Sequence, residues 1–113
     1  MFVDDEARLR HMLDAAREAL IFVAGKRRAD LDSSRQLTLA LVKCIEIIGE
    51  AAAKVTEATR QRHPSIPWPA IVGMRNRLIH GYWEIDLDRV WDTVTKNLPD
   101  LVPLLEKSVP PTT

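Results

Sequence analysis

The chain has 113 residues, enough for one domain with a single modest hydrophobic core. Its 16 basic and 16 acidic side chains cancel, which argues against a protein that coats DNA or an anionic membrane through bulk charge. The lone cysteine, Cys44, cannot form an internal disulfide, no apolar run reaches membrane-spanning length, and the start MFVDDEARLR is acidic where a signal peptide is basic. We therefore expect a cytoplasmic protein with no membrane partner.

A first helix is expected over residues 4–24. Apolar residues repeat along it at three- and four-residue spacing, which makes one buried stripe: Leu9, Met12, Leu13, Ala16, Leu20 and Val23. Asp4 or Asp5 can cap its start, and Gly25 suits a left-handed stop.

A second helix is expected over residues 34–60. It begins at SSRQ, where Ser33 and Gln36 have the spacing of a capping box. Its apolar stripe consists of Leu37, Leu41, Cys44, Ile45, Ile48, Ala52 and Val55. The prolines of HPSIPWP forbid further helix, and Pro67 or Pro69 suits the first turn of a third helix over residues 68–80.

A fourth helix is expected over residues 87–107, with Asp86 as its N-cap. Pro99 and Pro103 fall inside it, so we expect a kink or break around residues 97–99. No stretch shows sustained strand alternation. Amphipathic helices joined by short links predict a single all-α domain over residues 1–113, built as an antiparallel four-helix bundle.

Some apolar residues lie beside the main stripes: Ile21, Phe22, Ala40, Ile47 and Ala51. They could form a surface for a partner, because a bundle this small cannot easily cover every helix face. They could equally belong to a wide core stripe, and the pattern does not decide between these interpretations.

The segment GMRNRLIHGYWEID concentrates polar side chains beside apolar ones. On a helix of about 100° per residue, Arg75 falls at the edge of the apolar arc and Arg77 points toward solvent. A guanidinium at the edge of a core needs an anion. Either Glu46 or Glu50 pairs with it inside the protein, or Arg75 faces a pocket that receives a phosphate, which its planar fork suits.

His80 also has two interpretations. A histidine at a helix end is favoured by the helix dipole, and the same placement would hold an imidazole ready to move a proton. Asn76, four residues before His80, shares a neighbouring helix face with it. Tyr82 could be a packed aromatic or an exposed hydroxyl.

The run RNRLIHGY, read as Arg, four residues, His, any residue, Tyr, resembles the signature of HEPN-domain ribonucleases. It is most similar to that of the HepT-like toxins encoded beside minimal nucleotidyltransferases. The resemblance continues through CIEIIGEAAAKV, HPSIPWPAIVGMRNRLIHGYWEIDLDRVW and TVTKNLPDLVPLLE. It covers the chain from the first helix to the end.

The resemblance implies an all-helical homodimer that cleaves RNA without a metal or another cofactor. Arg75 and His80 would be the catalytic pair, with Asn76 and Arg77 supporting them. Tyr82 matches the tyrosine to which the partner nucleotidyltransferase, the antitoxin of a type VII-like pair, transfers AMP to silence the toxin. The alternative is a non-catalytic helical subunit that binds a nucleotide or presents Tyr82 to that partner.

The chain's own residues suit RNA cleavage through the 2′-hydroxyl, which needs proton transfer and stabilisation of a crowded phosphate. The histidines and Cys44 lack the spacing of metal ligands, and Cys44 lies in mid-stripe, where a nucleophile is not expected. Arg75 and His80 would be about 140° apart on an ideal helix. Either the helix distorts before Gly81, long side chains bridge the gap, or a second copy completes the site.

Overall fold

A computed structural model of the chain describes residues 4–80 and 84–110. In chain order its helices are α1 (Asp5–Val23), α2 (Asp30–Ser33), α3 (Arg35–Lys54), α4 (Glu57–Arg62), α5 (Trp68–Val72), α6 (Leu87–Asp92) and α7 (Leu98–Ser108). A 3₁₀ turn (Arg75–Arg77), two short strands, β1 (Ile79–His80) and β2 (Glu84–Ile85), and a π-helical turn (Thr93–Asn97) complete the fold. No helix in these two ranges is long and apolar enough to cross a membrane.

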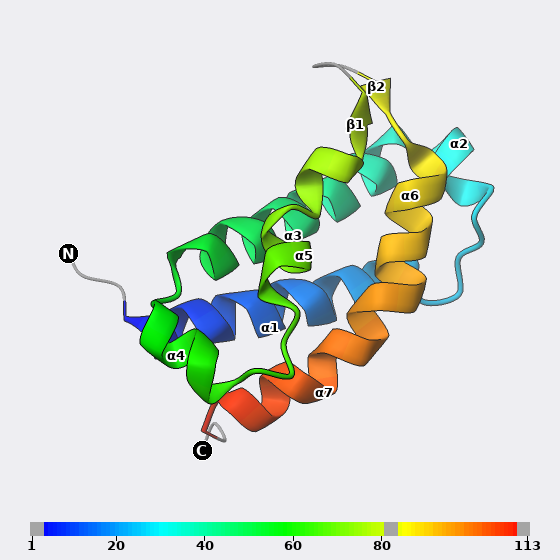
Figure 1. The fold of residues 1–113 in the computed structure, drawn as a ribbon. Coiled ribbons are helices and arrows are strands. Elements are labelled where there is room, and N and C mark those ends of the chain that lie inside the picture. The colour runs from blue at the N-terminus through cyan, green and yellow to red at the C-terminus, as the bar shows by residue number, and fades with distance from the viewer. Residues whose placement is uncertain (1–3, 81–83, 111–113) are drawn as a thin grey trace.

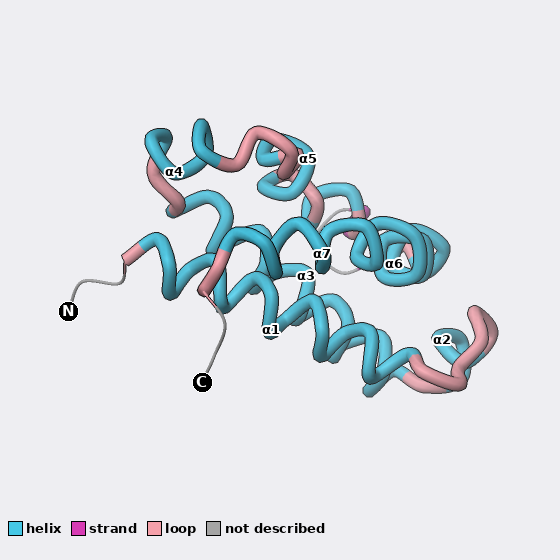
Figure 2. Tube along the Cα trace, turned by 90° about the horizontal axis from the view of Figure 1, so that it is seen from below, coloured by secondary structure: helices cyan, strands magenta, loops and turns pink. Residues whose placement is uncertain are grey.

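The long helices α1 and α3 lie side by side and run in opposite directions (Figure 1). The segment from α6 through the π-helical turn to α7 forms a third rod, which packs against α1. The short helices α4 and α5 occupy one side of these long elements (Figure 2). The expected all-α antiparallel bundle is therefore confirmed.

The core forms where the predicted stripes face each other. Met12, Ile45 and Leu105, from α1, α3 and α7, are fully buried. Burial of each such side chain contributes about 1.5–3 kcal/mol relative to leaving it in water. Asp4 and Asp86 cap α1 and α6 as expected, each accepting a hydrogen bond from a backbone N–H three residues on.

Some predicted boundaries need correction at the second helix. Ser34 is the N-cap of α3, where its hydroxyl accepts from the Leu37 N–H at 3.1 Å, so Ser33 does not cap it. The helix expected over residues 34–60 also breaks at Val55, whose backbone is extended, and resumes as α4. The break occurs where the carboxylate of Asp5 accepts hydrogen bonds from Thr56, so α1 fixes the start of α4.

The expected third helix over residues 68–80 is wrong beyond Val72. From Gly73 onward the backbone bonds span three residues: Asn76 N–H to Gly73 O at 3.1 Å and Leu78 N–H to Arg75 O at 3.0 Å. Residues 79–80 are then extended, because Ile79 pairs with Ile85 and His80 with Glu84 in an antiparallel ladder. In the fourth helix, a kink or break was expected around residues 97–99. The structure shows no break: helical backbone continues from α6 through the π-helical turn, which ends at Asn97, into α7.

Acid should weaken the junction between α1 and α4. Hydrogen bonds from the hydroxyls of Thr56 and Thr59, the second at 2.5 Å, hold the pKa of the Asp5 carboxyl below its usual range. A depressed folded-state pKa stabilises the fold above the unfolded value, near 3.9, and that contribution disappears as pH falls through the folded value. We expect Asp5→Asn to lower the free energy of unfolding by about 1 kcal/mol at pH 7 and by less at pH 3.

Urea denaturation at both pH values measures this difference. Asp14→Asn is the control, because Asp14 is an exposed carboxylate in the middle of α1 and makes no hydrogen bond or ion pair within residues 4–80 and 84–110. An equal effect of Asp5→Asn at the two pH values would contradict the prediction.

Candidate functional site

Arg75 lies in the 3₁₀ turn beside α3. Its Nε donates to Oε1 of Glu46 at 3.1 Å, and Lys43 Nζ lies 3.9 Å from the other oxygen of that carboxylate. The Arg75 side chain is 49% exposed and that of Glu46 is 23% exposed. Within the described ranges no hydrogen bond engages the Nη atoms of Arg75. The guanidinium is therefore anchored through Nε, and both Nη groups can still donate to an anion.

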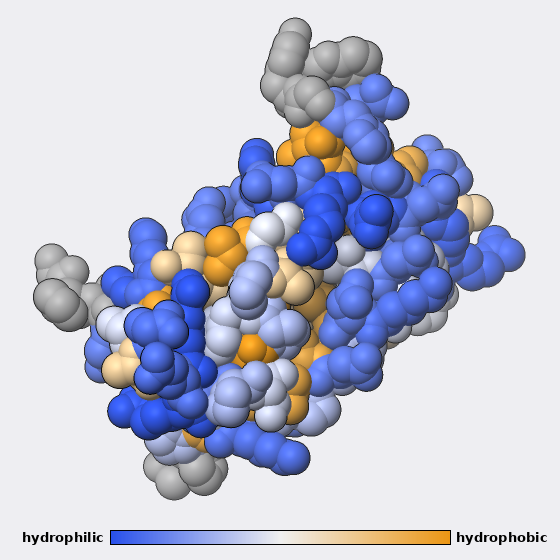
Figure 3. All heavy atoms as spheres, in the orientation of Figure 1, coloured by the Kyte–Doolittle hydropathy of each residue, from blue (hydrophilic) through white to orange (hydrophobic). Residues whose placement is uncertain are grey.

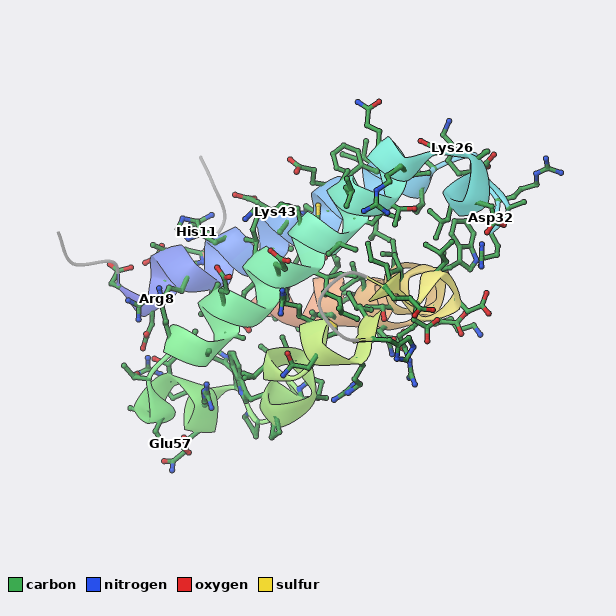
Figure 4. The ribbon with its side chains drawn as sticks, turned by 90° about the horizontal axis from the view of Figure 1, so that it is seen from above. Arg8, His11, Lys26, Asp32, Lys43 and Glu57 are labelled. Carbon is green, nitrogen blue, oxygen red and sulfur yellow. The ribbon has the colours of Figure 1, made fainter. Side chains whose placement is uncertain are left out.

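Glu50, the other carboxylate considered for Arg75, makes no hydrogen bond or ion pair with it among the described residues. It is exposed one turn further along α3 and lines a cleft of about 220 Å³ between α1 and α3. Arg8 and His11 of α1 line the same cleft (Figure 4). Of the two carboxylates, the structure thus places only Glu46 beside Arg75.

Asn76 and Arg77 follow Arg75 in the 3₁₀ turn, and both are exposed. Arg77 Nη2 donates to the backbone carbonyl of Ala70 at 3.3 Å, so Arg77 folds back over α5. The Asn76 side chain makes no hydrogen bond to any residue that the structure describes.

His80 lies in β1, and the expected position at the end of a helix is wrong. Its Nε2 is 3.3 Å from Oδ2 of Asp86, across the β1–β2 hairpin. The other oxygen of Asp86 accepts from the Arg89 N–H at 3.0 Å. The Arg89 N–H, and then the contact with His80, hold the pKa of Asp86 below its usual range. An ionised carboxylate thus orients one nitrogen of an imidazole whose side chain is 63% exposed.

The structure holds Arg75 and His80 through different carboxylates. Glu46 belongs to α3 and Asp86 to the start of α6. In the described part of the chain, no hydrogen bond or ion pair joins Arg75 to His80. Of the three geometries expected for this pair, the structure shows the distorted backbone before Gly81: residues 75–77 form a 3₁₀ turn and residues 79–80 are extended.

Comparison with known proteins identifies the family. Residues 12–108 match the family model described as Ribonuclease HepT-like. This chain belongs to the HepT-like ribonucleases. The match spans both long helices, the Arg75–His80 segment and the α6–α7 rod.

Named relatives agree with this assignment. A candidate RNase of Caldanaerobacter subterraneus subsp. tengcongensis is 36% identical over 93 residues, which cover 82% of this chain and 83% of the relative. A candidate RNase of Methanocaldococcus jannaschii is 30% identical over 106 residues, covering 94% and 88%. A probable ribonuclease HepT of Thermococcus cleftensis is 35% identical over 78 residues, covering 69% and 71%. No solved structure gives a significant match.

Other candidate chemistry in this HepT-like ribonuclease is limited. Burial, with the nearby carboxylate of Glu18, raises the pKa of the Cys44 thiol to about 11, so it is not a thiolate nucleophile at neutral pH. In residues 4–80 and 84–110, no group of three His, Cys, Asp or Glu side chains is placed to hold a metal ion. Tyr82 lies outside the described residues.

Sequence reasoning gave Asp86 only the role of an N-cap and missed its contact with His80. The two lie six positions apart, and strands of two residues carry no recognisable alternation. The available signal in the sequence was Gly81 between two short apolar stretches, because glycine commonly marks a turn.

Proposed function

We propose that this HepT-like ribonuclease cleaves RNA by attack of a 2′-hydroxyl on the adjacent phosphate, without a metal ion. The single observation that carries the proposal is the exposed imidazole of His80, oriented by the ionised carboxylate of Asp86. An exposed imidazole oriented in this way is placed to act as a general acid or base toward a substrate.

The reaction requires three contributions. The 2′-hydroxyl loses its proton as its oxygen bonds to phosphorus, the bond from phosphorus to the 5′-oxygen breaks, and that oxygen receives a proton. The products are a 2′,3′-cyclic phosphate and a 5′-hydroxyl. His80 would transfer protons, while the Nη groups of Arg75 would stabilise charge on the phosphate, with Asn76 and Arg77 as further donors.

A homodimer would bring the separated parts of the site together. Leu39 and Val72 are large apolar side chains that remain 45% and 38% exposed. Leu39 lies two helical turns before Glu46 on α3, and Val72 lies just before the 3₁₀ turn that carries Arg75. An interface through these side chains would place Arg75 of one copy close to the second copy, whose His80 could complete the site.

Regulation is proposed to act on Tyr82. This residue lies two positions after His80 and two before Glu84, so its hydroxyl belongs to the segment that joins the paired strands. AMP transferred there by a partner nucleotidyltransferase would add a bulky anion two positions from His80 in the sequence, and its charge and bulk would exclude RNA. The protein would then be the toxin of a cytoplasmic toxin–antitoxin pair.

Cleavage of total RNA by the purified protein in excess EDTA tests the proposal. We expect fragments that carry 2′,3′-cyclic phosphate ends, and we expect cleavage to stop after incubation with the partner nucleotidyltransferase and ATP. The Tyr82→Phe variant should cleave RNA but resist this silencing. An absence of cleavage would favour the non-catalytic partner-binding subunit. Loss of cleavage on addition of EDTA would instead contradict the metal-independent mechanism.

A further inference from the structure

A cavity of about 230 Å³ opens between α5 and the α6–α7 rod. Its floor is apolar, because Ile71, Met74 and Leu101 line it and are each at most 7% exposed. Figure 3 shows hydrophobic atoms between α5 and this rod, with strongly hydrophilic atoms at the upper end of the gap. Pockets for drug-sized ligands hold roughly 300–1,000 Å³, so this cavity suits a smaller, single planar group.

The rim of the cavity is polar and carries more positive than negative charge. Arg77 and Arg89 contribute guanidinium groups, Asp100 contributes one carboxylate, and Asn97 contributes an amide. In residues 4–80 and 84–110, the side chains of Arg89, Asn97 and Asp100 make no hydrogen bond or ion pair. An apolar floor beneath free donors, acceptors and guanidinium groups suits a nucleobase joined to a phosphate better than an apolar peptide side chain.

The cavity is connected to both halves of the candidate site. Arg77 belongs to the same 3₁₀ turn as Arg75. The backbone N–H of Arg89 holds the Asp86 carboxylate that contacts His80. Asn97 ends the π-helical turn, a feature often found at functional sites in proteins.

We propose that this cavity binds one nucleotide of the RNA substrate, with the base over the apolar floor and its phosphate on Arg77 and Arg89. The proposal rests on the ribonuclease function given above. It adds a specificity pocket, in which Asn97 and Asp100 contact the edge of the base. Single-stranded RNA is commonly read in this way, because its unstacked bases can enter a pocket.

Ala70→Phe tests the cavity directly. Ala70 is exposed on α5 and lines the opening, so a phenyl group would fill the space from the rim without replacing a core residue. The probe is a fluorescein-labelled, single-stranded 2′-O-methyl decanucleotide, which cannot be cleaved through its 2′-oxygen. Loss of roughly 40 Å² of apolar contact, at about 25 cal/mol per Å², weakens affinity roughly fivefold. We therefore expect fluorescence polarisation to show at least fivefold weaker binding. Ala58→Phe, at another exposed alanine, on α4, should bind as the wild type does.

The salt dependence of binding measures the phosphate contact separately. Arg89→Gln should reduce the slope of log affinity against log salt by about 0.7, the value for one phosphate contact on a single strand. Arg35→Gln, at the exposed start of α3, should leave the slope unchanged. Thermal melts establish that each variant is folded, and the surface change at Arg89 decides the matter if Ala70→Phe is unstable.

The outcomes separate this inference from the ribonuclease proposal. If the wild type cleaves RNA and binds the probe, but Ala70→Phe and Arg89→Gln match it in affinity and salt slope, the nucleotide pocket is wrong and the ribonuclease stands. If the wild type neither binds the probe nor cleaves RNA, both proposals fail. The pocket is supported if Ala70→Phe binds the probe more weakly and Arg89→Gln has a shallower salt slope, while Ala58→Phe and Arg35→Gln match the wild type.

Discussion

His80→Ala is expected to lower the rate of RNA cleavage by about 10²- to 10⁴-fold, the usual contribution of a positioned general acid or base. The fold should change little. The imidazole is 63% exposed, and its contact with Asp86 is the only hydrogen bond or ion pair that it makes within the described residues. Cleavage rates on a defined RNA at saturating protein measure the effect, and circular dichroism with thermal melting establishes that the variant is folded.

His11→Ala is the matched control for this experiment. His11 is an exposed histidine on α1, in the cleft that Arg8 and Glu50 also line. It should retain the wild-type rate. If both variants cleaved RNA at the wild-type rate, His80 would have no part in proton transfer, and its contact with Asp86 would serve only to stabilise the hairpin.

The long elements could be predicted because their information is local. Apolar residues recur every three or four positions along α1, α3 and the α6–α7 rod, and most of each stripe is buried where the pattern places it. Leu20 and Leu37 are partly buried. The caps Asp4 and Asp86 and the left-handed Gly25, with a φ of 75°, were also evident in the sequence. Each of these features depends only on residues close together in the sequence, so it could be predicted correctly.

The segment after Val72 shows where local reasoning fails. Ile71, Met74 and Leu78 have helical spacing and are all buried, yet only Ile71 lies in an α-helix. Distant contacts determine the backbone here. The Asp86 N–H donates to the Leu78 carbonyl at 2.6 Å, and Glu46 of α3 anchors Arg75. A sequence window of one helix cannot contain such partners, so the burial was predictable and the backbone path was not.

The difference between local and distant contacts also explains which site residues could be predicted from the sequence. Charge alone predicted that Arg75, a cation at the edge of a core, needs an anion, with Glu46, Glu50 or a phosphate as candidates. The structure places Glu46 beside it. The contact of His80 with Asp86 requires a hairpin. The cavity between α5 and the α6–α7 rod requires side chains from separate elements to converge, among them Arg77 and Arg89. Such convergence becomes visible only in three dimensions.

Arg75→Ala is expected to reduce cleavage by about 10²- to 10³-fold, the loss typical for removal of one donor to a developing negative charge. Stability should fall by no more than about 1 kcal/mol, because a partly exposed ion pair contributes little and the Arg75 side chain is 49% exposed. Rates on the same RNA and urea denaturation measure the two effects separately.

Glu46→Gln provides the control for Arg75. It removes the charge of the partner and leaves the guanidinium in place. If Arg75 served only the ion pair, both variants would lose the same small stability and neither would lose much activity. If Arg75 binds the reacting phosphate, Arg75→Ala should be far less active than Glu46→Gln at equal stability. Equal activities of the two variants would contradict the catalytic role.

Co-expression of Arg75→Ala with His80→Ala tests whether Arg75 and His80 act together within one copy or across a homodimer. In a mixed homodimer with composite sites, one site lacks both residues and the other has both. Random assembly should therefore restore about a quarter of the wild-type activity. If Arg75 and His80 of one copy act together, every site in the mixture lacks one of them and activity should stay at the level of the single variants. Because the structure holds Arg75 on Glu46 and His80 on Asp86, with no hydrogen bond or ion pair between them in the described part of the chain, we expect recovery.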